Sequence, residues 1–508
     1  MATTTPPVSP RLRPHLAKTR DRRRRAAVAV LAVGVVLAEL LLGAAIADPR
    51  FVLLLVAAGG AAGLAVLYRL PAIGVVAVLV LAASLFSGDF LAFEVGRFKT
   101  YPFEIVLGGL LLVALVAPRR PTWGGTAGLA LAGFLGLLVL SGALALSAGR
   151  AEPVQILNWG RPFALLTLFF VVVRLFPTRA EAMQLAVAGA IVGGITGALS
   201  LFVAIGSDLG PTLASATESF VTPGEGVGQL SRVRLPGLGL AYVLFWFAVI
   251  AFVEARGPRR LGWGLVLAGD VVGITLSFNR NMWIGLLLGL CLTLLLARRP
   301  VRRRLATGTT AVIAVGAAIM FFLPGTTGNG SAIDPLVQRG STLLDPGELQ
   351  DESSLQNRGD ETERALEAAV DSPLIGIGAG APFGVFYNEQ RGSESYVRTA
   401  QRFLHNQYLY LVLVAGIPGL ICFLVYVGSV LRRAAQRAGS DPRTAALGVG
   451  LLTVATSALV AIYFSVPDMT SVVGLVTGVI VAATAGDEPP TEHDSRGTGA
   501  AQASASSW

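Results

Sequence analysis

Long apolar runs recur along almost the whole chain, and they constrain its fold more than any other feature of the sequence. Most of them approach the roughly 20 residues that a helix needs to cross a bilayer. Only 14% of the residues are charged and the mean hydropathy is +0.67, whereas soluble domains carry about 25% charged residues. Nothing alternates with a period of two, as the strands of a membrane barrel would. The sequence therefore predicts an all-α, polytopic membrane protein.

The apolar runs give the expected number of membrane spans. They cover residues 26 to 47, 51 to 68, 70 to 87, 102 to 118, 126 to 147, 162 to 176, 183 to 205, 236 to 254, 261 to 277, 282 to 297, 306 to 323, 407 to 430, 445 to 465 and 468 to 485. We expect about 14 transmembrane helices, about 11 before the long polar break and about three after it. The sequence "AIA" before Asp48 resembles a signal-peptidase site, but the first run exceeds the roughly 7 to 15 apolar residues of a signal peptide. It is therefore interpreted as an uncleaved anchor.

Arginine-rich segments predict the orientation. The first run follows "RDRRRR", and alternate loops contain "PRRP", "EARGPRR", "ARRPVRRR" and "LRRAAQRAGSDPR". Cytoplasmic loops of membrane proteins carry such an excess of Lys and Arg. Both termini are therefore expected in the cytoplasm of a multi-pass plasma-membrane protein. The net charge of +9 follows from this topology, and nucleic acid is not an expected partner.

The same pattern divides the chain into five parts. They are a cytoplasmic basic tail (1–25), a transmembrane bundle (26–323), a sizeable external loop with short helices (324–402), a second transmembrane part (403–485) and a disordered cytoplasmic tail (486–508). The external loop is acidic, and "DETERALEAAV" within it predicts a helix. Cys291 and Cys422 both lie in apolar runs, so the loop has no disulfide framework.

One histidine and several arginines fall on the predicted external face. His15 and His493 lie in the tails, which leaves His405 at the mouth of the span that follows the loop. The arginines on this face are Arg97, Arg161, Arg232, Arg234, Arg280 and Arg358. Any one of them could simply extend to the lipid headgroups. Together with His405 they suggest a site for an anionic headgroup.

Four motifs then resemble a known family. The stretch "NRGDETERALEAAVDSPLIGIGAGAPFG", followed by "RFLHNQYLYLVLVAGIPGLICFL", is similar to the C-terminal half of the O-antigen ligase and O-antigen polymerase superfamily. "RLPG" and the "NR" turn resemble the family's two earlier arginine motifs, and the likeness runs from about residue 230 to 430. The chain departs from the pattern at Asn279, where the family usually has Ser, and it lacks the family's Trp after Arg358.

The resemblance implies transfer of a glycan from a polyprenyl-diphosphate carrier to an acceptor hydroxyl outside the membrane. The guanidinium groups of arginines can hold the diphosphate leaving group with paired hydrogen bonds. Histidine is suited to act as a base near neutral pH. We expect His405, Arg280 and Arg358 to be catalytic, with neighbouring arginines disfavouring protonated His405. The residues expected to bind the diphosphate are Arg234, Arg280, Arg358, Arg232 and Arg161.

No metal and no cofactor are expected. The partners implied are the carrier-linked donor, a glycan or lipid acceptor and the bilayer, while the sugar and the choice between ligation and polymerisation stay open. Alternatively, His405 could cap the following helix or hydrogen-bond locally.

Other functions were weighed against this one. A lipid-linked oligosaccharide flippase or other transporter would show related halves and polar groups deep in the spans, and a scaffold would leave the four motifs unexplained. Asp270 and Glu39 lie inside predicted spans, where a carboxylate is costly, but each could simply pair with a buried polar group. Gly376, Gly378 and Gly380 in "GIGAG" could suggest a phosphate cradle, yet a Gly-rich run alone is weak support. They are interpreted as shaping the return of the loop to the membrane.

Overall fold

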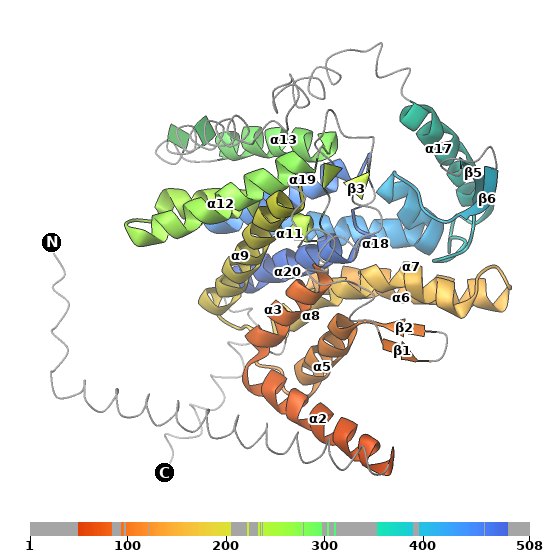
Figure 1. The fold of residues 1–508 in the computed structure, drawn as a ribbon, viewed down its shortest axis with the longest axis horizontal. Coiled ribbons are helices and arrows are strands. Elements are labelled where there is room, and N and C mark those ends of the chain that lie inside the picture. The colour runs from red at the N-terminus through yellow and green to blue at the C-terminus, as the bar shows by residue number, and fades with distance from the viewer. Residues whose placement is uncertain are drawn as a thin grey trace, which may run out of the picture. The chain divides into compact units, whose positions relative to one another are not determined.

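The chain is largely helical in a computed structural model (Figure 1). The residues that the structure describes are 49–83, 93–95, 98–120, 122–204, 221–222, 232–233, 235, 237–277, 279–296, 302–303, 309–310, 353–389, 396–461 and 463–485. The chain divides into an N-terminal unit, residues 1–69, and a second unit that begins at Leu70. The first unit contains helix α2 (Pro49–Arg69). All further elements belong to the second unit.

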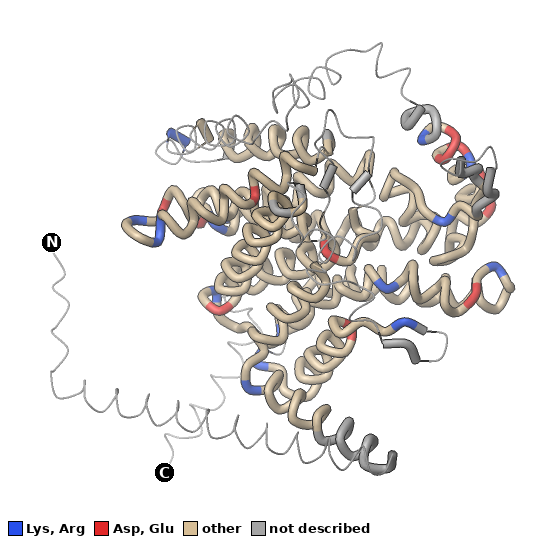
Figure 2. Tube along the Cα trace, in the orientation of Figure 1, with Lys and Arg blue, Asp and Glu red and all other residues tan. Residues whose placement is uncertain are grey.

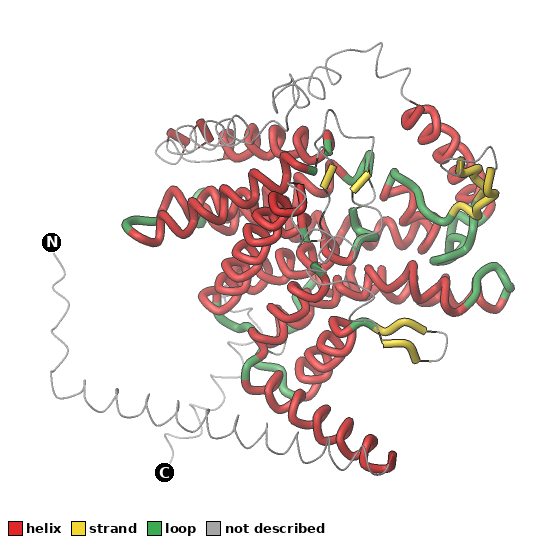
Figure 3. Tube along the Cα trace, viewed as in Figure 1, coloured by secondary structure: helices red, strands yellow, loops and turns green. Residues whose placement is uncertain are grey.

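Helices make up most of the second unit, and three short antiparallel hairpins accompany them (Figure 3). The helices are α3 (Pro71–Ala82), α5 (Pro102–Val116), α6 (Thr126–Ser147), α7 (Pro153–Ala164), η1 (Leu165–Thr167), α8 (Leu168–Leu175), α9 (Arg179–Ala204), α11 (Leu238–Glu254), α12 (Pro258–Leu276), α13 (Arg280–Leu296), α17 (Ser353–Asp371), α18 (Gln407–Arg437), α19 (Pro442–Ser457) and α20 (Pro467–Thr484). The hairpins pair β1 (Phe93–Val95) with β2 (Phe98–Thr100), β3 (Val221–Thr222) with β4 (Arg232–Val233), and β5 (Gly384–Glu389) with β6 (Tyr396–Gln401). The all-α prediction is confirmed, and the hairpins are additions to it.

Proline marks where many of these helices begin. It occupies the first turn of α3, α5, α7, α12, α19 and α20. The first turn of a helix leaves its backbone N–H groups without an internal partner, so a proline costs no hydrogen bond there and presets φ. The apolar runs thus predict where helices lie, and the prolines predict where several of them start.

Five helices in the described part of the chain are long and apolar enough to cross a membrane, or six if Gly59–Arg69 and Pro71–Ala82 count as one broken span. They are Thr126–Ser147, Pro153–Leu175, Arg179–Leu201, Gln407–Arg437 and Pro467–Thr484. Shorter apolar helices cover Pro102–Val116, Leu238–Glu254 and Asn281–Leu295. The predicted span 26 to 47 lies outside the described residues, as does almost all of 306 to 323. A count of about 14 spans therefore stays a prediction.

Several predicted boundaries differ from the helices. The run 445 to 465 is helical only to Ser457, and the described residues between it and α20, 458 to 461 and 463 to 466, are irregular. The run 162 to 176 is part of a longer helical segment that begins at Pro153 and passes through the 3₁₀ turn η1. Hydropathy alone missed both helix boundaries, because apolar residues also fill tightly packed turns.

Helices α11 and α20 form the centre of the second unit. Every residue from Leu238 to Ala251 of α11 is buried, and so is nearly all of α20. A helix that is apolar on all sides belongs inside a bundle. Helices α8, α9, α18 and α19 pack around α20, whereas α6 leaves much of its surface exposed. Charged side chains are scarce along the helix middles and more frequent near their ends and on α17 (Figure 2).

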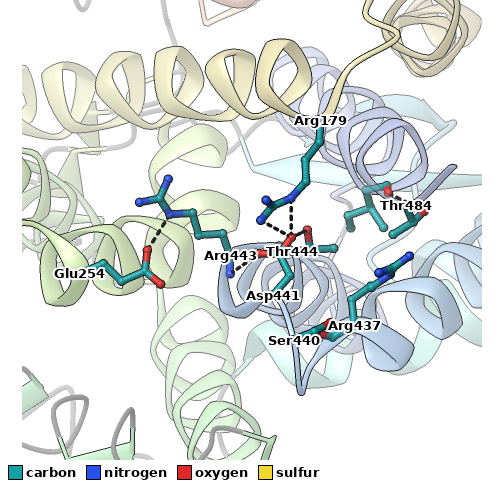
Figure 4. Close-up of polar contacts among 9 residues, drawn as sticks. Arg179, Glu254, Arg437, Ser440, Asp441, Arg443, Thr444 and Thr484 are labelled. Atoms are coloured by element: carbon teal, nitrogen blue, oxygen red, sulfur yellow. Dashed lines mark hydrogen bonds and ion pairs between the residues drawn. The ribbon is translucent and has the colours of Figure 1, made fainter. Parts of the chain in front are cut away.

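Ion pairs join several helix ends at one end of the bundle, which we call the basic end (Figure 4). Arg179, at the start of α9, places Nη2 2.7 Å from Asp441 Oδ2, and Arg443 Nε lies 2.7 Å from Glu254 Oε2 at the end of α11. Asp441 also caps α19, because its carboxylate accepts hydrogen bonds from the backbone N–H of Arg443 and from Thr444 Oγ1. Burial alone would raise the pKa of Asp441, but the bonds from Thr444 and Arg179 outweigh it and hold the pKa below its ordinary value.

The predicted cytoplasmic loop that contains "PRRP" also reaches the basic end. The guanidinium of Arg120, in "PRRP", donates to the backbone oxygens of Pro177 and Ala482. Three arginine-bearing segments that the charge pattern predicts to be cytoplasmic therefore share one end of the bundle. Which compartment that end faces stays a prediction.

The opposite end, which we call the histidine end, collects the starts of α11, α18 and α20. Asp468, in the first turn of α20, accepts hydrogen bonds from the backbone N–H groups of Gly237 (3.0 Å) and Gly239 (3.1 Å) at the start of α11. Gln407, the first residue of α18, donates its N–H to Ala458 O just beyond α19 (3.0 Å), and its side chain accepts from Phe464 N (3.0 Å). These contacts fix the chain around His405.

Candidate active site

His405 lies in the short connection between strand β6 and helix α18. Its neighbour Asn406 is the N-cap of α18, and the Asn406 side chain accepts a hydrogen bond from Leu409 N (3.1 Å). A capping side chain satisfies a backbone N–H that the first helical turn leaves free. Because Asn406 fills this position, His405 is not the helix cap.

His405 instead contacts a carboxylate on the loop helix. Its Nδ1 lies 2.8 Å from Oε2 of Glu361, which is on α17. The Glu361 side chain is 14% exposed and that of His405 is 35% exposed. Phe403 packs edge-on against the imidazole, with ring centroids 5.8 Å apart. A carboxylate can only accept here, so Nδ1 carries the proton and neutral His405 keeps Nε2 as its free acceptor.

This contact adds a residue that sequence reasoning missed. The charged partner in contact with His405 is Glu361, and the arginines expected around His405 stay a prediction. Helix α17 folds back over the start of α18, which brings together residues 44 positions apart. The available signal was an acid one turn after Arg358 in "NRGDETERALEAAV", since residues three apart share a helix face.

Arg358 shares the face of α17 that bears Glu361. Its Nη1 donates to the backbone oxygen of Val460 (3.4 Å), in the connection between α19 and α20. Its Nε is buried and has no hydrogen-bond partner among the residues that the structure describes. A buried donor without a partner is unfavourable, so this guanidinium retains capacity for an incoming anion. The loop arginine and the histidine thus both lie at the histidine end.

The backbone places the start of α13 at the same end. Arg280 is the first residue of α13 and follows a tight turn in which Ser277 and Asn279 hydrogen-bond the chain. One turn further along, Gly285 faces the hydroxyl groups of Tyr242 and Ser457, the last residue of α19. The expected short turn between two helices is confirmed, and the diphosphate role of Arg280 stays a prediction.

The two arginines before α11 are less fully described. Arg232 belongs to strand β4, whereas Arg234 lies outside the described residues. Gly237, which follows Arg234 within one turn, is held by Asp468 at the histidine end. The proposed ligand roles of both arginines stay predictions.

Arg161 is engaged with its own neighbourhood. Its Nε lies 2.5 Å from Glu104 Oε1, its Nη2 donates to Lys99 O (2.6 Å), and its guanidinium lies 4.6 Å from the centroid of the Tyr101 ring. These contacts join α7 to the start of α5. They give Arg161 a packing role without any ligand, and its role in diphosphate binding stays untested.

The Gly-rich stretch of the loop packs into a break in α18. Gly416 has φ 71° and ψ 177° inside that helix. The freed backbone groups bond to the loop instead: Ile377 N donates to Leu413 O (2.7 Å) and Ile417 N donates to Pro373 O (2.8 Å). Positive φ values at Gly376, Gly378 and Gly380 require glycine. These glycines therefore shape the loop's return to the bundle, as the sequence indicates.

Asp270 lies buried in α12, 1% exposed, and neither carboxylate oxygen has a hydrogen-bond partner among the residues that the structure describes. The pairing suggested for Asp270 is therefore not seen within this part of the chain, and Glu39 lies outside it. In the part of the chain that the structure describes, no group of three His, Cys, Asp or Glu side chains could hold a metal ion. Metal independence stays a prediction.

Comparison with known families identifies one domain in this chain. Residues 263–424 match the family described as O-antigen ligase, so the chain contains an O-antigen ligase domain. The match covers Arg280, Arg358, Glu361 and His405. A search of curated proteins finds no significant match.

Proposed function

We propose that this membrane protein moves a glycan from a polyprenyl-diphosphate carrier to an acceptor hydroxyl, with His405 as the general base. The observation that carries the proposal is the 2.8 Å contact between His405 Nδ1 and Glu361 Oε2. A base whose second nitrogen is held by a carboxylate has a fixed tautomer and a fixed ring orientation. The O-antigen ligase domain supports lipid-linked glycans as the substrate class.

The reaction follows from these groups. Nε2 of His405 takes the proton of the acceptor hydroxyl while the hydroxyl oxygen attacks the anomeric carbon of the donor sugar. The bond from that carbon to the phosphate oxygen breaks, and polyprenyl diphosphate leaves with the electron pair. Glu361 stabilises the imidazolium that forms at His405, because a negative charge next to it offsets its positive charge.

The leaving diphosphate needs positive charge close by. Arg358 has a buried Nε with no partner in the described part of the chain, and a guanidinium can hold two phosphate oxygens at once. Arg280 begins a helix, and the N-terminus of a helix also attracts anions. We propose that Arg358, Arg280 and Arg234 bind the diphosphate together and that Arg232 contributes nearby.

The proposed topology places this chemistry on the outer face of the plasma membrane. The arginine segments gathered at the basic end support a cytoplasmic location for that end. The histidine end then faces outward, together with the segment from 324 to 402. About 14 spans, with both termini in the cytoplasm, complete this topology.

The test is transfer by the purified full chain in proteoliposomes. The donor is the pool of polyprenyl-diphosphate-linked glycans extracted from the source cells, and the readout is free polyprenyl diphosphate. We expect release that depends on added acceptor fraction and on His405. Movement of the donor across the bilayer without release of polyprenyl diphosphate would instead identify a flippase and reject the proposal.

A further inference from the structure

Helix α17 carries exposed apolar side chains along one flank. Ala365 and Ala369 are buried against the rest of the protein, whereas Leu366 is 56% exposed and Val370 is 70% exposed. Residues four apart stand one above the other on a helix, so Leu366 and Val370 form a stripe. The exposed acidic residues of α17 are Asp360, Glu363, Glu367 and Asp371. Most of them lie on the side of the helix that faces away from its buried alanines.

The stripe continues beyond the end of the helix. Leu374 is 70% exposed and Ile375 is 37% exposed. We call Leu366, Val370, Leu374 and Ile375 the apolar edge. Four large apolar side chains exposed along a helix and the turn that follows it are unusual for a surface that faces water.

Contacts of the neighbouring backbone show where Leu374 and Ile375 lie along helices α6 and α18. Pro373 O accepts from Ile417 N (2.8 Å) in the break of α18, and Gly378 faces Ser141 O and Ala145 of α6. Ser141 and Ala145 belong to the last two turns of α6, within about 10 Å of its end at 1.5 Å per residue. Because α6 is one of the candidate spans, these contacts put Leu374 and Ile375 beside helix segments that a bilayer would surround.

The edge also joins a surface that faces lipid. Residues 410 to 416 of α18 are buried, but from Ile417 onward one side of the helix is exposed. Its exposed apolar residues are Ile417, Ile421, Leu424 and Val425. In a membrane-spanning helix such residues contact acyl chains. Leu374 adjoins this surface because the backbone at Leu374 packs against Gly416.

We infer that the apolar edge lies in the bilayer, with the acyl chains of the leaflet at the histidine end as its occupant. Helix α17 is then an interfacial helix, with lipid on its apolar flank and water on its acidic side. An acidic face gains nothing from anionic headgroups, so the contact depends on apolar area. On the proposed function, this lipid contact would also hold Arg358 and Glu361 at the level of the carrier's phosphates.

Spin-label accessibility tests the inference independently of glycan transfer. Single labels are placed at Leu366→Cys and Val370→Cys in a Cys291→Ala, Cys422→Ala background, with Glu367→Cys as the matched control. The full chain is reconstituted in nanodiscs of phosphatidylethanolamine and phosphatidylglycerol. Relaxation by oxygen, which concentrates in lipid, is compared with relaxation by a neutral nickel chelate, which stays in water.

We expect the oxygen-to-nickel ratio at Leu366→Cys and Val370→Cys to exceed that at Glu367→Cys several-fold. Equal ratios at the three positions would overturn the inference, because the edge would then face water. Low accessibility to both reagents would also overturn it, because protein would then cover the edge. If the cysteine-free background does not fold, an impermeant maleimide added to the chain with its native cysteines decides, and it should modify Glu367→Cys several-fold faster than Val370→Cys.

Discussion

Glu361 Oε2 on α17 lies 2.8 Å from Nδ1 of His405, so the helix of the polar break and the mouth of the next span form one unit. The pair connects the segment before α18 to the position from which a base would act. The same helix presents Arg358 to the connection between α19 and α20. A displacement of α17 would therefore move Glu361 away from His405 and would move Arg358 as well.

Glu361→Gln should reduce glycan transfer only by weakening the action of His405. A glutamine can still accept from Nδ1, but it offers no negative charge to the imidazolium, and we expect a loss of about 10- to 100-fold in turnover. The decisive measurement is a double-mutant cycle on purified protein. Glu361→Gln should cost little in a His405→Ala background, whereas an equal loss in both backgrounds would make Glu361 a structural residue only.

His405→Ala should lower transfer by about 10²- to 10⁴-fold, the usual worth of a general base, with membrane abundance little changed. His405→Gln is the matched control, because glutamine can hydrogen-bond to Glu361 but is not basic. Both rates are measured as carrier-linked glycan consumed per folded molecule. Near-normal turnover in His405→Gln would refute the catalytic role.

Arg280→Lys should lose most activity although it keeps the charge, because an ammonium cannot hold two phosphate oxygens as a guanidinium fork does. We expect weaker donor binding as well, seen as a raised KM for the carrier-linked donor. Arg259→Lys is the control, an exposed arginine near the start of α12 at the basic end. Unchanged kinetics in Arg280→Lys would reduce Arg280 to a surface anchor.

Local patterns in the sequence predict most of the described helices and place His405 just before one of them. Apolar runs locate the long helices, and "DETERALEAAV" predicts the part of α17 that follows Arg358. The Glu361 contact joins residues 44 positions apart, and no local pattern encodes the pairing of two separate elements. The sequence also could not identify the N-cap of α18. His405 and Asn406 are adjacent, and only backbone geometry shows which of them accepts from Leu409 N.

The break in α18 marks another limit of the sequence. "AGIPG" suggests an irregular turn, yet the apolar run continues through it and predicts one helix. The structure shows a kink at Gly416, where the loop supplies hydrogen-bond partners for Leu413 O and Ile417 N. Hydropathy cannot reveal such a break, because it measures side chains and the break concerns backbone hydrogen bonds.

Asp441→Asn should destabilise the basic end by about 1 kcal/mol at neutral pH, because the ion pair with Arg179 is lost while the cap is kept. The pKa of Asp441 is lower in the folded protein than its ordinary value. Its contribution is therefore fully present above the unfolded pKa of about 3.9 and is lost as pH falls through the folded value. Thermal unfolding at neutral pH should separate Asp441→Asn from wild type, and the difference should shrink at pH values below about 4.

Glu254→Gln is the control for that comparison. Glu254 and Arg443 are both substantially exposed, and an exposed ion pair contributes little, so we expect a change within about 0.5 kcal/mol. A pH-independent difference between Asp441→Asn and wild type would show that the charge of Asp441 is not what stabilises this end.

Cysteine labelling in intact cells should show which compartment each end of the bundle faces. Glu367→Cys on α17 and Ser393→Cys should react with an impermeant thiol reagent, whereas Ser440→Cys at the basic end should react only after the membrane is opened. The native Cys291 and Cys422 lie in α13 and α18, so they give a low background that wild-type cells measure. The expectation follows from the arginines gathered around Arg443 and Arg179, because cytoplasmic loops retain positive charge. Labelling in the opposite sense would place His405 and Glu361 in the cytoplasm, away from any acceptor on the cell surface.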